Sequence, residues 1–367
     1  MGFYIGLMSG TSLDGIDAVL VDLAEGGKTL TVLAHSHAPF APELRSELLA
    51  LNAPGDNELH RAALAANALA LACEERIEAV LGGTSRAQVR AIGAHGQTVR
   101  HRPGAFDGIG YTCQLLNGAL LAERCGIDVV CDFRSRDVAA NGQGAPLVPA
   151  FHAALFAQPD MATAVLNLGG IANLTLLPAE GPVLGFDCGP ANALLDGWCE
   201  RHTGQPYDEG GRWAASGRVD EALLAQWLAE PYFARRPPKS TGRDLFSLDW
   251  LDPQTLTSRD AADVQATLAE LTARSVAADL VRHAPASRQL WVCGGGAHNT
   301  HVMQRLTALL PGIRIRLTDE AGLQVTQVEA AAFAWLAQAF LEKRPGNLPE
   351  VTGAQGPRVL GALYPAR

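Results

Sequence analysis

A segment near the amino terminus, residues 9–17, contains the residue types that bind phosphate groups. Its hydroxyl side chains can donate hydrogen bonds, and its glycines leave backbone N–H groups open to a close ligand. An anionic phosphate requires a concave set of such donors. The residues concerned are Ser9, Gly10, Thr11, Ser12 and Gly15. An ordinary hairpin with a polar tip is the alternative for this loop alone.

The same segment contains two carboxylates that indicate a metal ion. Asp14 and Asp17 would repel a bare phosphate group. They are explained if Mg²⁺ lies between carboxylate and phosphate oxygens. We therefore predict a Mg²⁺ site at Asp14 and Asp17, next to a phosphate site.

Two further glycine loops occur in the second half of the chain. Gly169 and Gly170 separate two apolar runs, and the three glycines 294–296 follow a third apolar run. Loops in different halves could bind one polyphosphate from both sides, while residues 294–296 could contact a base or ribose closely. A plain strand-to-helix turn is the alternative for the last loop. The chain has no G-x-x-x-x-G-K-[ST] motif, which excludes a P-loop.

Two carboxylates are candidates for the chemical step. Asp187 follows an apolar run and precedes a predicted helix, so it can act as a base or cap that helix. Phosphoryl transfer to an alcohol needs a carboxylate placed to take a proton. Glu329 stands among small apolar residues, and its alternative role is to complement the dipole of the helix that begins there.

Two arginines could bind a carboxylate of the substrate. Arg134 and Arg136 follow a predicted strand and can each donate bidentate hydrogen bonds. Surface ion pairs with Asp132 or Asp137 are the alternative.

A polar segment after another short strand could contact sugar hydroxyls. His95 and Gln97 can both donate and accept hydrogen bonds. A buried histidine whose hydrogen bonds are all within the protein is an equal alternative for His95.

Composition limits the class of protein. The chain has 367 residues, of which 48% are hydrophobic, so two domains are expected. The net charge of −9 disfavours nonspecific nucleic-acid binding. The seven cysteines form no C-x-x-C pair, so we expect neither a disulfide framework nor a zinc site. No signal peptide or membrane helix is evident, and the cytoplasm is the expected location.

The predicted elements are those of an α/β protein whose two halves have a similar order of strands and helices. Each half opens with two strands around a polar glycine loop and continues as strand, helix and strand. Helices are expected at residues 60–81, 261–283 and about 327–342, and an irregular surface tail from residue 345. We expect a first lobe of residues 1–134 plus about 340–367, and a second of residues 135–339.

Seven motifs together resemble those of the anhydro-N-acetylmuramic acid kinases, which belong to the superfamily of sugar kinases, heat-shock ATPases and actin. They occur in the family's order over essentially the whole chain. Three substitutions depart from the usual motifs, namely Asn141 for Gly, Cys188 for Thr and Ala191 for Gly. The motifs are residues 6–17, 94–98, 142–149, 167–175, 186–190, 293–299 and 328–330.

The resemblance implies two ribonuclease-H-like lobes with ATP bound in a cleft between them, and a homodimer. It implies that water opens 1,6-anhydro-N-acetylmuramic acid while O6 takes the γ-phosphate of ATP, giving N-acetylmuramic acid 6-phosphate and ADP, a step of cell-wall sugar recycling. Asp187 would activate the water, Glu329 would help to hold the sugar, and Arg134 would lie beside the anhydro bridge or the transferred phosphate.

The remaining site residues follow from the same resemblance. Sugar contacts would come from His95, Gln97, Thr98 and Arg134. Nucleotide and Mg²⁺ contacts would come from Gly10, Thr11, Ser12, Leu13, Asp14, Gly15, Ile16, Asp17, Gly169, Gly170, Asn173, Gly294, Gly295, Gly296 and Asn299.

Two other classes of function remain open. Another sugar or acetate-kinase-like enzyme of the same superfamily would not incorporate water into its product. A regulatory, chaperone-like ATPase would hydrolyse ATP without a sugar acceptor.

Overall fold

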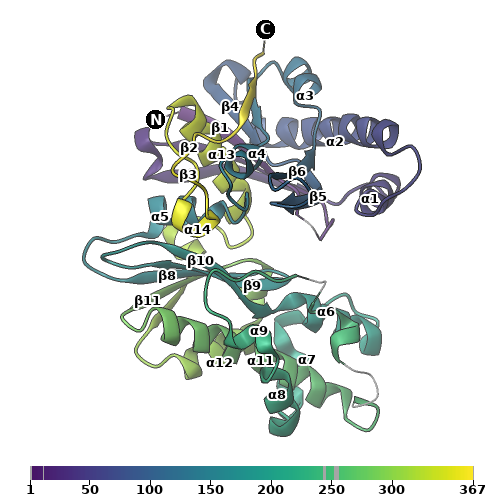
Figure 1. Ribbon diagram of the computed structural model, residues 1–367, viewed down its shortest axis with the longest axis vertical. Coiled ribbons are helices and arrows are strands. Elements are labelled where there is room, and N and C mark those ends of the chain that lie inside the picture. The colour runs from purple at the N-terminus through teal and green to yellow at the C-terminus, as the bar shows by residue number, and fades with distance from the viewer. Residues whose placement is uncertain (1, 11, 243–244, 252–255, 367) are drawn as a thin grey trace. The chain divides into compact units, whose positions relative to one another are not determined.

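The computed structural model describes residues 2–10, 12–242, 245–251 and 256–366 (Figure 1). The chain divides into two compact units. Unit 1 comprises Met1–Leu155 and Gln327–Arg367, and unit 2 comprises Phe156–Thr326. The expected boundaries at residues 134 and 339 are therefore corrected. The helix from residue 328 packs on the sheet of unit 1, and for that reason the chain returns to unit 1 earlier than expected.

Unit 1 is built on a six-stranded mixed sheet with the order β13-β7-β4-β1-β2-β3. The strands β1, β2 and β3 form an antiparallel meander, whereas β4 is parallel to β1 and β7 is parallel to β4. Their bounds are β1 Gly2–Met8, β2 Ile16–Leu23, β3 Leu30–Ala38, β4 Val89–Ala94, β7 Val129–Cys131 and β13 Ala362–Tyr364.

Helix α13 (Val328–Leu341) lies directly on this sheet because two strand positions are glycine. A Cβ atom on Gly6 would come 1.9 Å from the carbonyl oxygen of Ala330, and one on Gly93 would come 1.9 Å from that of Phe333. Only glycine allows the helix and strand backbones to approach so closely. This packing places the start of α13 next to the ends of β1 and β4.

Helix α2 (Glu58–Leu81) contributes to a hydrophobic core of unit 1. The buried residues of α2 include Leu69, Cys73 and Ile77, which are four residues apart and so share one face, and the helix expected at residues 60–81 is confirmed. The other elements of unit 1 are α1 Pro42–Ala50, β5 Gln97–Pro103, β6 Gly110–Leu115, α3 Gly118–Cys125, α4 Ser135–Ala139, α5 Val148–Phe156 and α14 Pro349–Thr352.

Unit 2 repeats the topology of unit 1. Its five-stranded sheet has the order β10-β9-β8-β11-β12, with an antiparallel meander followed by two parallel pairings, as in β3-β2-β1-β4-β7. The bounds are β8 Thr163–Leu168, β9 Ile171–Leu177, β10 Leu184–Pro190, β11 Gln289–Cys293 and β12 Arg314–Leu317. Both units therefore have the expected ribonuclease-H-like arrangement.

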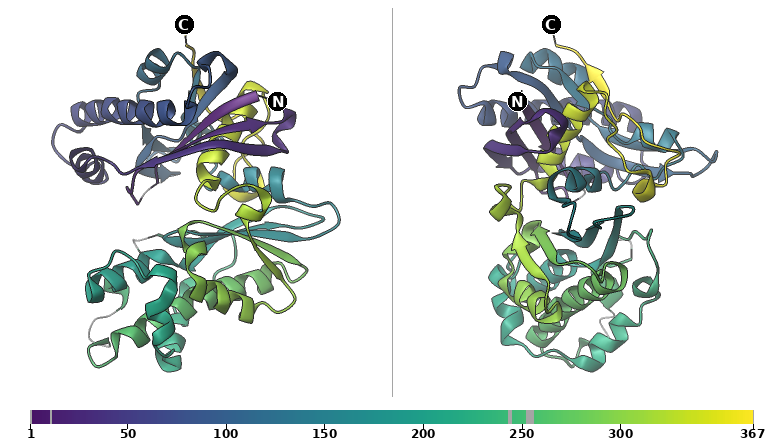
Figure 2. Two further views of the ribbon diagram at one scale, coloured as in Figure 1. Left: turned by 180° about the vertical axis from the view of Figure 1, so that it is seen from behind. Right: turned by 90° about the vertical axis from the view of Figure 1, so that its left-hand side faces the viewer.

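The helices of unit 2 gather around α11 (Ala261–His283), which packs on β9 and β10 (Figure 2). Nearly every residue of α11 from Val264 to Leu280 is buried. The other helices are α6 Asn192–Thr203, α7 Arg212–Ser216, α8 Glu221–Leu228, α9 Pro231–Ala234 and α12 Thr300–Leu309.

The tail after residue 345 is more ordered than expected. It contains α14 and β13, and it buries Asn347, Thr352 and Leu360. The strand β13 pairs with β7, so the prediction of an irregular surface tail is wrong there. In the described part of the chain, no helix is long and apolar enough to cross a membrane.

Candidate active site

The predicted phosphate loop of unit 1 connects β1 to β2. Its backbone turns where the Leu13 N–H donates to the Gly10 carbonyl oxygen at 3.2 Å. Leu13 is buried with a φ of 58°, a conformation that is rare for a bulky residue. The Arg45 Nε–H donates to the Leu13 carbonyl oxygen at 3.1 Å and helps to hold this turn. Thr11 lies outside the described residues.

The two predicted metal ligands differ in their surroundings. Asp14 is exposed, whereas the Oδ1 atom of Asp17 is 3.1 Å from His35 Nε2 and 3.1 Å from His37 Nδ1 on the neighbouring strand β3. Among the described residues, no group of three or more His, Cys, Asp or Glu side chains has an arrangement that could hold a metal ion without other ligands. Mg²⁺ at nucleotide sites is usually held by one or two carboxylates with phosphate oxygens and water. Asp14 and the second oxygen of Asp17 fit that pattern.

Hydrogen bonds join the phosphate loop to the segment after β4. The Ser9 Oγ–H donates to the Gly96 carbonyl oxygen at 3.1 Å, and the Gln97 Nε2–H donates to the Gly10 carbonyl oxygen at 3.1 Å. His95 Nδ1 lies 3.2 Å from the Ser9 carbonyl oxygen. The strand ends of β1 and β4 therefore form one rigid edge of the sheet.

His95 has protein partners at both ring nitrogens. Its Nε2 accepts from the Arg134 Nε–H at 3.0 Å, so the ring is neutral and carries its proton on Nδ1, which donates to Ser9. Burial and the nearby Arg134 charge lower the pKa of His95 to about 3. The structure therefore matches the alternative in which both ring nitrogens of His95 hydrogen-bond within the protein. Through its Nε2 atom, His95 holds the guanidinium group of Arg134 in place.

Arg134 is a partly buried cation of unit 1. It precedes α4, and its NH1 donates to the Gly144 carbonyl oxygen at 2.8 Å. Burial lowers the pKa of Arg134 to about 10, and the negative charges of Glu329 and Asp137 oppose that change. Glu329 lies in the first turn of α13, so its helix-dipole role and a role beside Arg134 are compatible.

Asp137 is a residue whose function the sequence did not reveal. It is fully buried rather than paired at the surface with Arg134 or Arg136. Its Oδ2 accepts from the Gly144 N–H at 2.7 Å, while its Oδ1 accepts from Asn347 Nδ2 at 2.6 Å and Thr352 Oγ1 at 2.8 Å. Asp137 thus fixes the segment that holds Arg134 and joins it to the carboxy-terminal tail.

The other predicted sugar contacts lie nearby. Gln97 is 1% exposed, and its Oε1 is buried without a partner in the described part of the chain. Thr98 Oγ1 accepts from the Gln114 Nε2–H at 3.2 Å across the β5–β6 hairpin. Arg136 is exposed, and in the part of the chain that the structure describes it forms no ion pair with Asp132 or Asp137.

The glycine turn of unit 2 rests on the amino terminus of α6. The N–H groups of Ala191 and Ala193 donate to the Gly170 carbonyl oxygen, and the Asn192 N–H donates to that of Gly169. This turn connects β8 to β9 just as the phosphate loop connects β1 to β2. The two predicted phosphate loops are therefore equivalent in the repeated topology.

Some glycines of the predicted site are needed by the fold. A Cβ on Gly294 would come 2.3 Å from Asn167 Oδ1, and one on Gly296 would come 2.7 Å from Leu168 Cβ. Gly15 is equally constrained, because a Cβ there would come 2.1 Å from the Ala38 carbonyl oxygen.

Other glycines have space that the protein does not fill. A Cβ on Gly295 would meet no atom closer than 4.0 Å, and the nearest atoms are 3.6 Å away for Gly10 and Gly170 and 3.5 Å for Gly169. None of the four has a φ in the left-handed region. The packing of the protein does not require glycine at these four positions. Glycine there would allow a nucleotide to approach the backbone closely.

The two predicted asparagines have different environments. Asn299 caps α12, where its Oδ1 accepts from the Val302 N–H at 3.1 Å. Asn173 lies on β9 between Asn167 of β8 and Asp187 of β10, so the three side chains form a row on one face of the sheet.

Asp187 lies within β10, at a bulge between Asp187 and Gly189. It does not cap α6, because the N-cap residue is Ala191, so the helix-cap alternative is wrong. Its neighbour Phe186 packs against His283 of α11, and Asp187 therefore faces away from α11. Burial raises the pKa of Asp187.

The carboxylate of Asp187 is held by a loop whose contact with Asp187 the sequence did not reveal. Its Oδ2 accepts from the Ser240 Oγ–H at 2.9 Å and from the Thr241 N–H at 3.0 Å. These hydrogen bonds and the charge of Lys239 lower the pKa of Asp187 against the larger effect of burial. The segment 237–243, rich in Pro, Ser and Thr, was the available signal, although its spacing from Asp187 could not be inferred.

The three departures from the family motifs have different surroundings. Asn141 has a φ of 63°, a left-handed conformation that glycine favours and asparagine tolerates. Ala191 has a φ of −134° and a ψ of −115°, so its φ lies outside the left-handed region. Cys188 is fully buried beside Asp279 on the face opposite to Asp187.

Comparisons with known proteins agree with these motifs. The family model described as anhydro-N-acetylmuramic acid kinase matches residues 2–366. The chain is 60% identical to the anhydro-N-acetylmuramic acid kinase of Variovorax paradoxus, covering 99% of each protein. It is 58% identical to that of Cupriavidus metallidurans, covering 99% of this chain and 97% of the relative.

A solved structure also aligns with the chain. Component A of the (R)-2-hydroxyglutaryl-CoA dehydratase of Acidaminococcus fermentans is 13% identical, with a TM-score of 0.48 and coverage of 92% of this chain and 100% of that one. Likenesses of this level carry no functional information, whereas the sequence matches extend over the full length. The chain belongs to the anhydro-N-acetylmuramic acid kinase family.

Proposed function

We propose that this protein is an ATP-dependent kinase that opens 1,6-anhydro-N-acetylmuramic acid with water and phosphorylates O6. The products are N-acetylmuramic acid 6-phosphate and ADP, which would serve the recycling of cell-wall sugar. Membership of the family and the names of its relatives support this reaction and substrate.

The observation that carries the proposal is the environment of Asp187. Its carboxylate is largely buried, faces away from α11, and has a pKa raised by burial, which makes it a stronger base near neutral pH. It lies in a row with Asn173, close along β9 to the bare turn at Gly170. A proton acceptor near a phosphate loop is the combination that the reaction requires.

The chemical step balances with Asp187 as the base. Asp187 takes a proton from water as the water oxygen bonds to the anomeric carbon. The bond between that carbon and O6 breaks, and O6 forms a bond to the γ-phosphorus as ADP leaves. An alkoxide is a poor leaving group, so direct transfer of its charge to a phosphoryl group removes the need for separate protonation.

The residues of unit 1 would bind and orient the sugar and the phosphate. Arg134, fixed by His95 and Gly144, would neutralise the anionic groups, and Glu329 would hold a sugar hydroxyl. Gly10, Gly169, Gly170 and Gly295 would allow close contact with ATP. Mg²⁺ at Asp14 and Asp17 would supply charge neutralisation for the phosphates.

The assembly and the location are further parts of the proposal. We propose a homodimer in the cytoplasm, with no nucleic-acid or membrane partner. Analytical ultracentrifugation of the full chain tests the assembly, because a single species with the mass of one chain at all concentrations contradicts a dimer.

Product analysis in heavy-oxygen water tests the reaction. Mass spectrometry of the product should find one label at the anomeric position, because water supplies that oxygen. An unlabelled product would favour another sugar or acetate-like kinase. ATP hydrolysis that is unchanged by adding the anhydro sugar, or by a panel of ordinary sugars, would favour a regulatory ATPase.

The variant Asp187→Asn tests the assignment of the base. Removing general-base catalysis should lower turnover by about 10²–10⁴-fold and leave ATP binding nearly intact. The matched control is Asp160→Asn, which changes an exposed aspartate of the same unit and should keep normal turnover. Near-normal turnover in Asp187→Asn would remove Asp187 from the mechanism.

A further inference from the structure

The loop that holds Asp187 contacts it at three points, and helix α9 adds a fourth contact through Tyr232. Besides the Ser240 and Thr241 hydrogen bonds to its carboxylate, the Asp187 N–H donates to the Lys239 carbonyl oxygen at 3.1 Å. The Tyr232 hydroxyl donates to the Asp187 carbonyl oxygen at 2.8 Å. Residues 239–241 belong to no helix or strand, so no regular backbone ladder fixes their position.

The side chain of Lys239 anchors this loop on the other face of the sheet. It is 1% exposed, and its Nζ lies 2.7 Å from Oδ2 of Asp279, a buried residue of α11. The ammonium group also lies 5.1 Å from the ring centre of Tyr232 and 5.8 Å from that of Phe186. The loop is thus attached to the helix that packs under β10.

The ion pair is hard to explain by stability alone. Two charges that are withdrawn from water lose their hydration, and apolar residues of similar volume often give an equal or higher stability. Such a pair does have directional requirements that apolar packing lacks. A buried pair at this point determines where the next two residues of the loop lie, and both of those residues hydrogen-bond to Asp187.

We propose that Lys239 and Asp279 are positioning residues, whose ion pair fixes the Ser240 and Thr241 donors on the carboxylate of Asp187. The inference rests on the proposed role of Asp187 as the base. Neither Lys239 nor Asp279 touches the substrate in this scheme. They set the orientation of the carboxylate and the pH at which it becomes a base.

Several charged or titratable groups act on this region. Lys239 lowers the pKa of Asp187, whereas burial and then the negative charges of Asp187 and Asp279 raise the pKa of Tyr232. Because donors to a carboxylate stabilise its charged form, loss of the Ser240 or Thr241 hydrogen bond should raise the pH needed to ionise Asp187.

The test measures kcat and KM of the full chain as a function of pH. Ser240→Ala removes one donor and should move the acid-side midpoint of kcat upward by about one pH unit. Lys239→Met should move the midpoint in the same direction, while KM for ATP changes by less than about twofold. The double variant Lys239→Met/Ser240→Ala should show no more than the larger single effect, because Lys239→Met already displaces the donor that Ser240→Ala removes.

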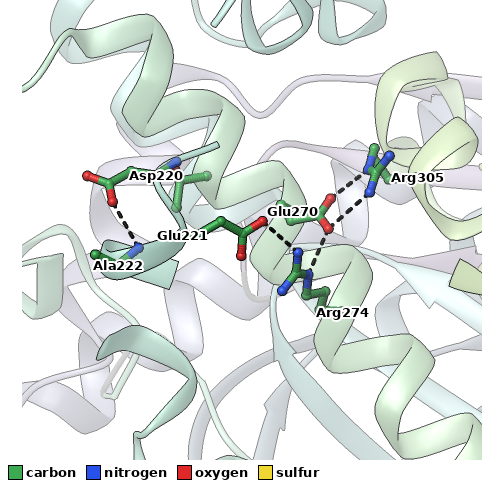
Figure 3. Close-up of polar contacts among 7 residues, drawn as sticks. Asp220, Glu221, Ala222, Glu270, Arg274 and Arg305 are labelled. Carbon is green, nitrogen blue, oxygen red and sulfur yellow. Dashed lines mark hydrogen bonds and ion pairs between the residues drawn. The ribbon is translucent and has the colours of Figure 1, made fainter. Parts of the chain in front are cut away.

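A network on the same helix supplies a matched control (Figure 3). Glu270 of α11 is also buried, and its carboxylate accepts from Arg274 Nε at 2.8 Å and from Arg305 Nε at 2.6 Å. Arg274 NH2 also donates to Glu221 at 2.9 Å (Figure 3). Glu270→Gln should lower stability but leave the midpoint of kcat unchanged. When it is combined with Ser240→Ala, the losses of stability should add and the midpoint should be that of Ser240→Ala alone.

A second variant covers the case in which Lys239→Met fails to fold. That change leaves the buried Asp279 charge unpaired, whereas Lys239→Met/Asp279→Leu removes both charges and should fold. We expect the same upward shift of the midpoint in this variant. A wild-type midpoint and kcat in the folded Lys239→Met/Asp279→Leu variant would overturn the inference. Midpoint shifts of Lys239→Met and Ser240→Ala that simply add in their double variant would overturn it as well.

The two proposals fail in distinguishable ways. Normal turnover in Asp187→Asn would remove the base itself. An inactive Asp187→Asn, combined with a shift in Ser240→Ala and none in Lys239→Met/Asp279→Leu, would overturn only the positioning role.

Discussion

Gly295 has no side chain although the protein leaves room for one. The nearest atom to a Cβ there, Asn192 Nδ2, is 4.0 Å away, whereas the neighbouring Gly296 would bring a Cβ within 2.7 Å of Leu168. Packing thus explains Gly296 but not Gly295. The contrast separates a glycine that the fold needs from one that a ligand would need.

The variant Gly295→Ala tests that distinction. It should keep the thermal stability of the protein but weaken ATP binding by about ten- to hundredfold, because overpacking against a ligand costs about 1–3 kcal/mol. Titration with ATP and thermal unfolding measure the two effects. Gly296→Ala serves as the comparison and should lose stability as well. Unchanged ATP affinity in Gly295→Ala would separate this turn from the nucleotide.

At the scale of elements, Asp137 connects three parts of unit 1. It belongs to α4, contacts the loop at Gly144, and receives hydrogen bonds from Asn347 and Thr352 of the tail. All of these partners are donors, and the carboxylate is an acceptor only. The placement of Arg134 therefore depends on Asp137, and Asp137 is itself held by a tail that lies about 210 residues further along the chain.

The variant Asp137→Asn introduces an amide donor opposite other donors. It should destabilise the protein by about 2–4 kcal/mol and reduce turnover, because a buried hydrogen-bond network is broken. Urea denaturation followed by circular dichroism measures the loss. The control Thr352→Val removes one hydrogen bond only and should cost about 1 kcal/mol. Equal stability of Asp137→Asn and the wild type would contradict the proposed network.

At the scale of the whole molecule, two buried histidines make stability depend on pH. Burial lowers the pKa of His95 and of His152 to about 3, compared with 6.5 for an ordinary histidine. Between these values the unfolded chain binds more protons than the folded protein. The stability is therefore complete above about pH 6.5 and falls as the pH decreases toward 3. The raised pKa values of Asp187 and Asp279 oppose this slope at its acid end.

Urea denaturation between pH 7.5 and 5 tests this dependence. The free energy of unfolding should fall with decreasing pH by up to about 1.4 kcal/mol per pH unit for each histidine. His152→Leu should reduce the slope of the free energy of unfolding against pH by the share of one histidine and leave the share of His95. A stability that is constant from pH 7.5 to 5 would show that these rings bind protons equally in the folded and unfolded states, and would contradict the lowered pKa values.

Much of the local structure could be predicted from the sequence. The hairpin of β1 and β2, the helix α2 and the strand β11 followed by glycines come from patterns that are contained in a few neighbouring residues. The elements that were missed, such as α1 and β13, are short and lack strong periodicity. The strand β13 forms because it pairs with β7, a partner distant in sequence.

The sequence by itself determined the family, the repeated order of elements and the candidate loops, because motifs and hydrophobic periodicity are local properties. Only the tertiary structure decided that Asp187 faces away from α11, that Lys239 meets Asp279, and that Asp137 binds Asn347 across 210 residues. Such contacts depend on strand register and on the burial of charge, and neither quantity is encoded within a short window of residues.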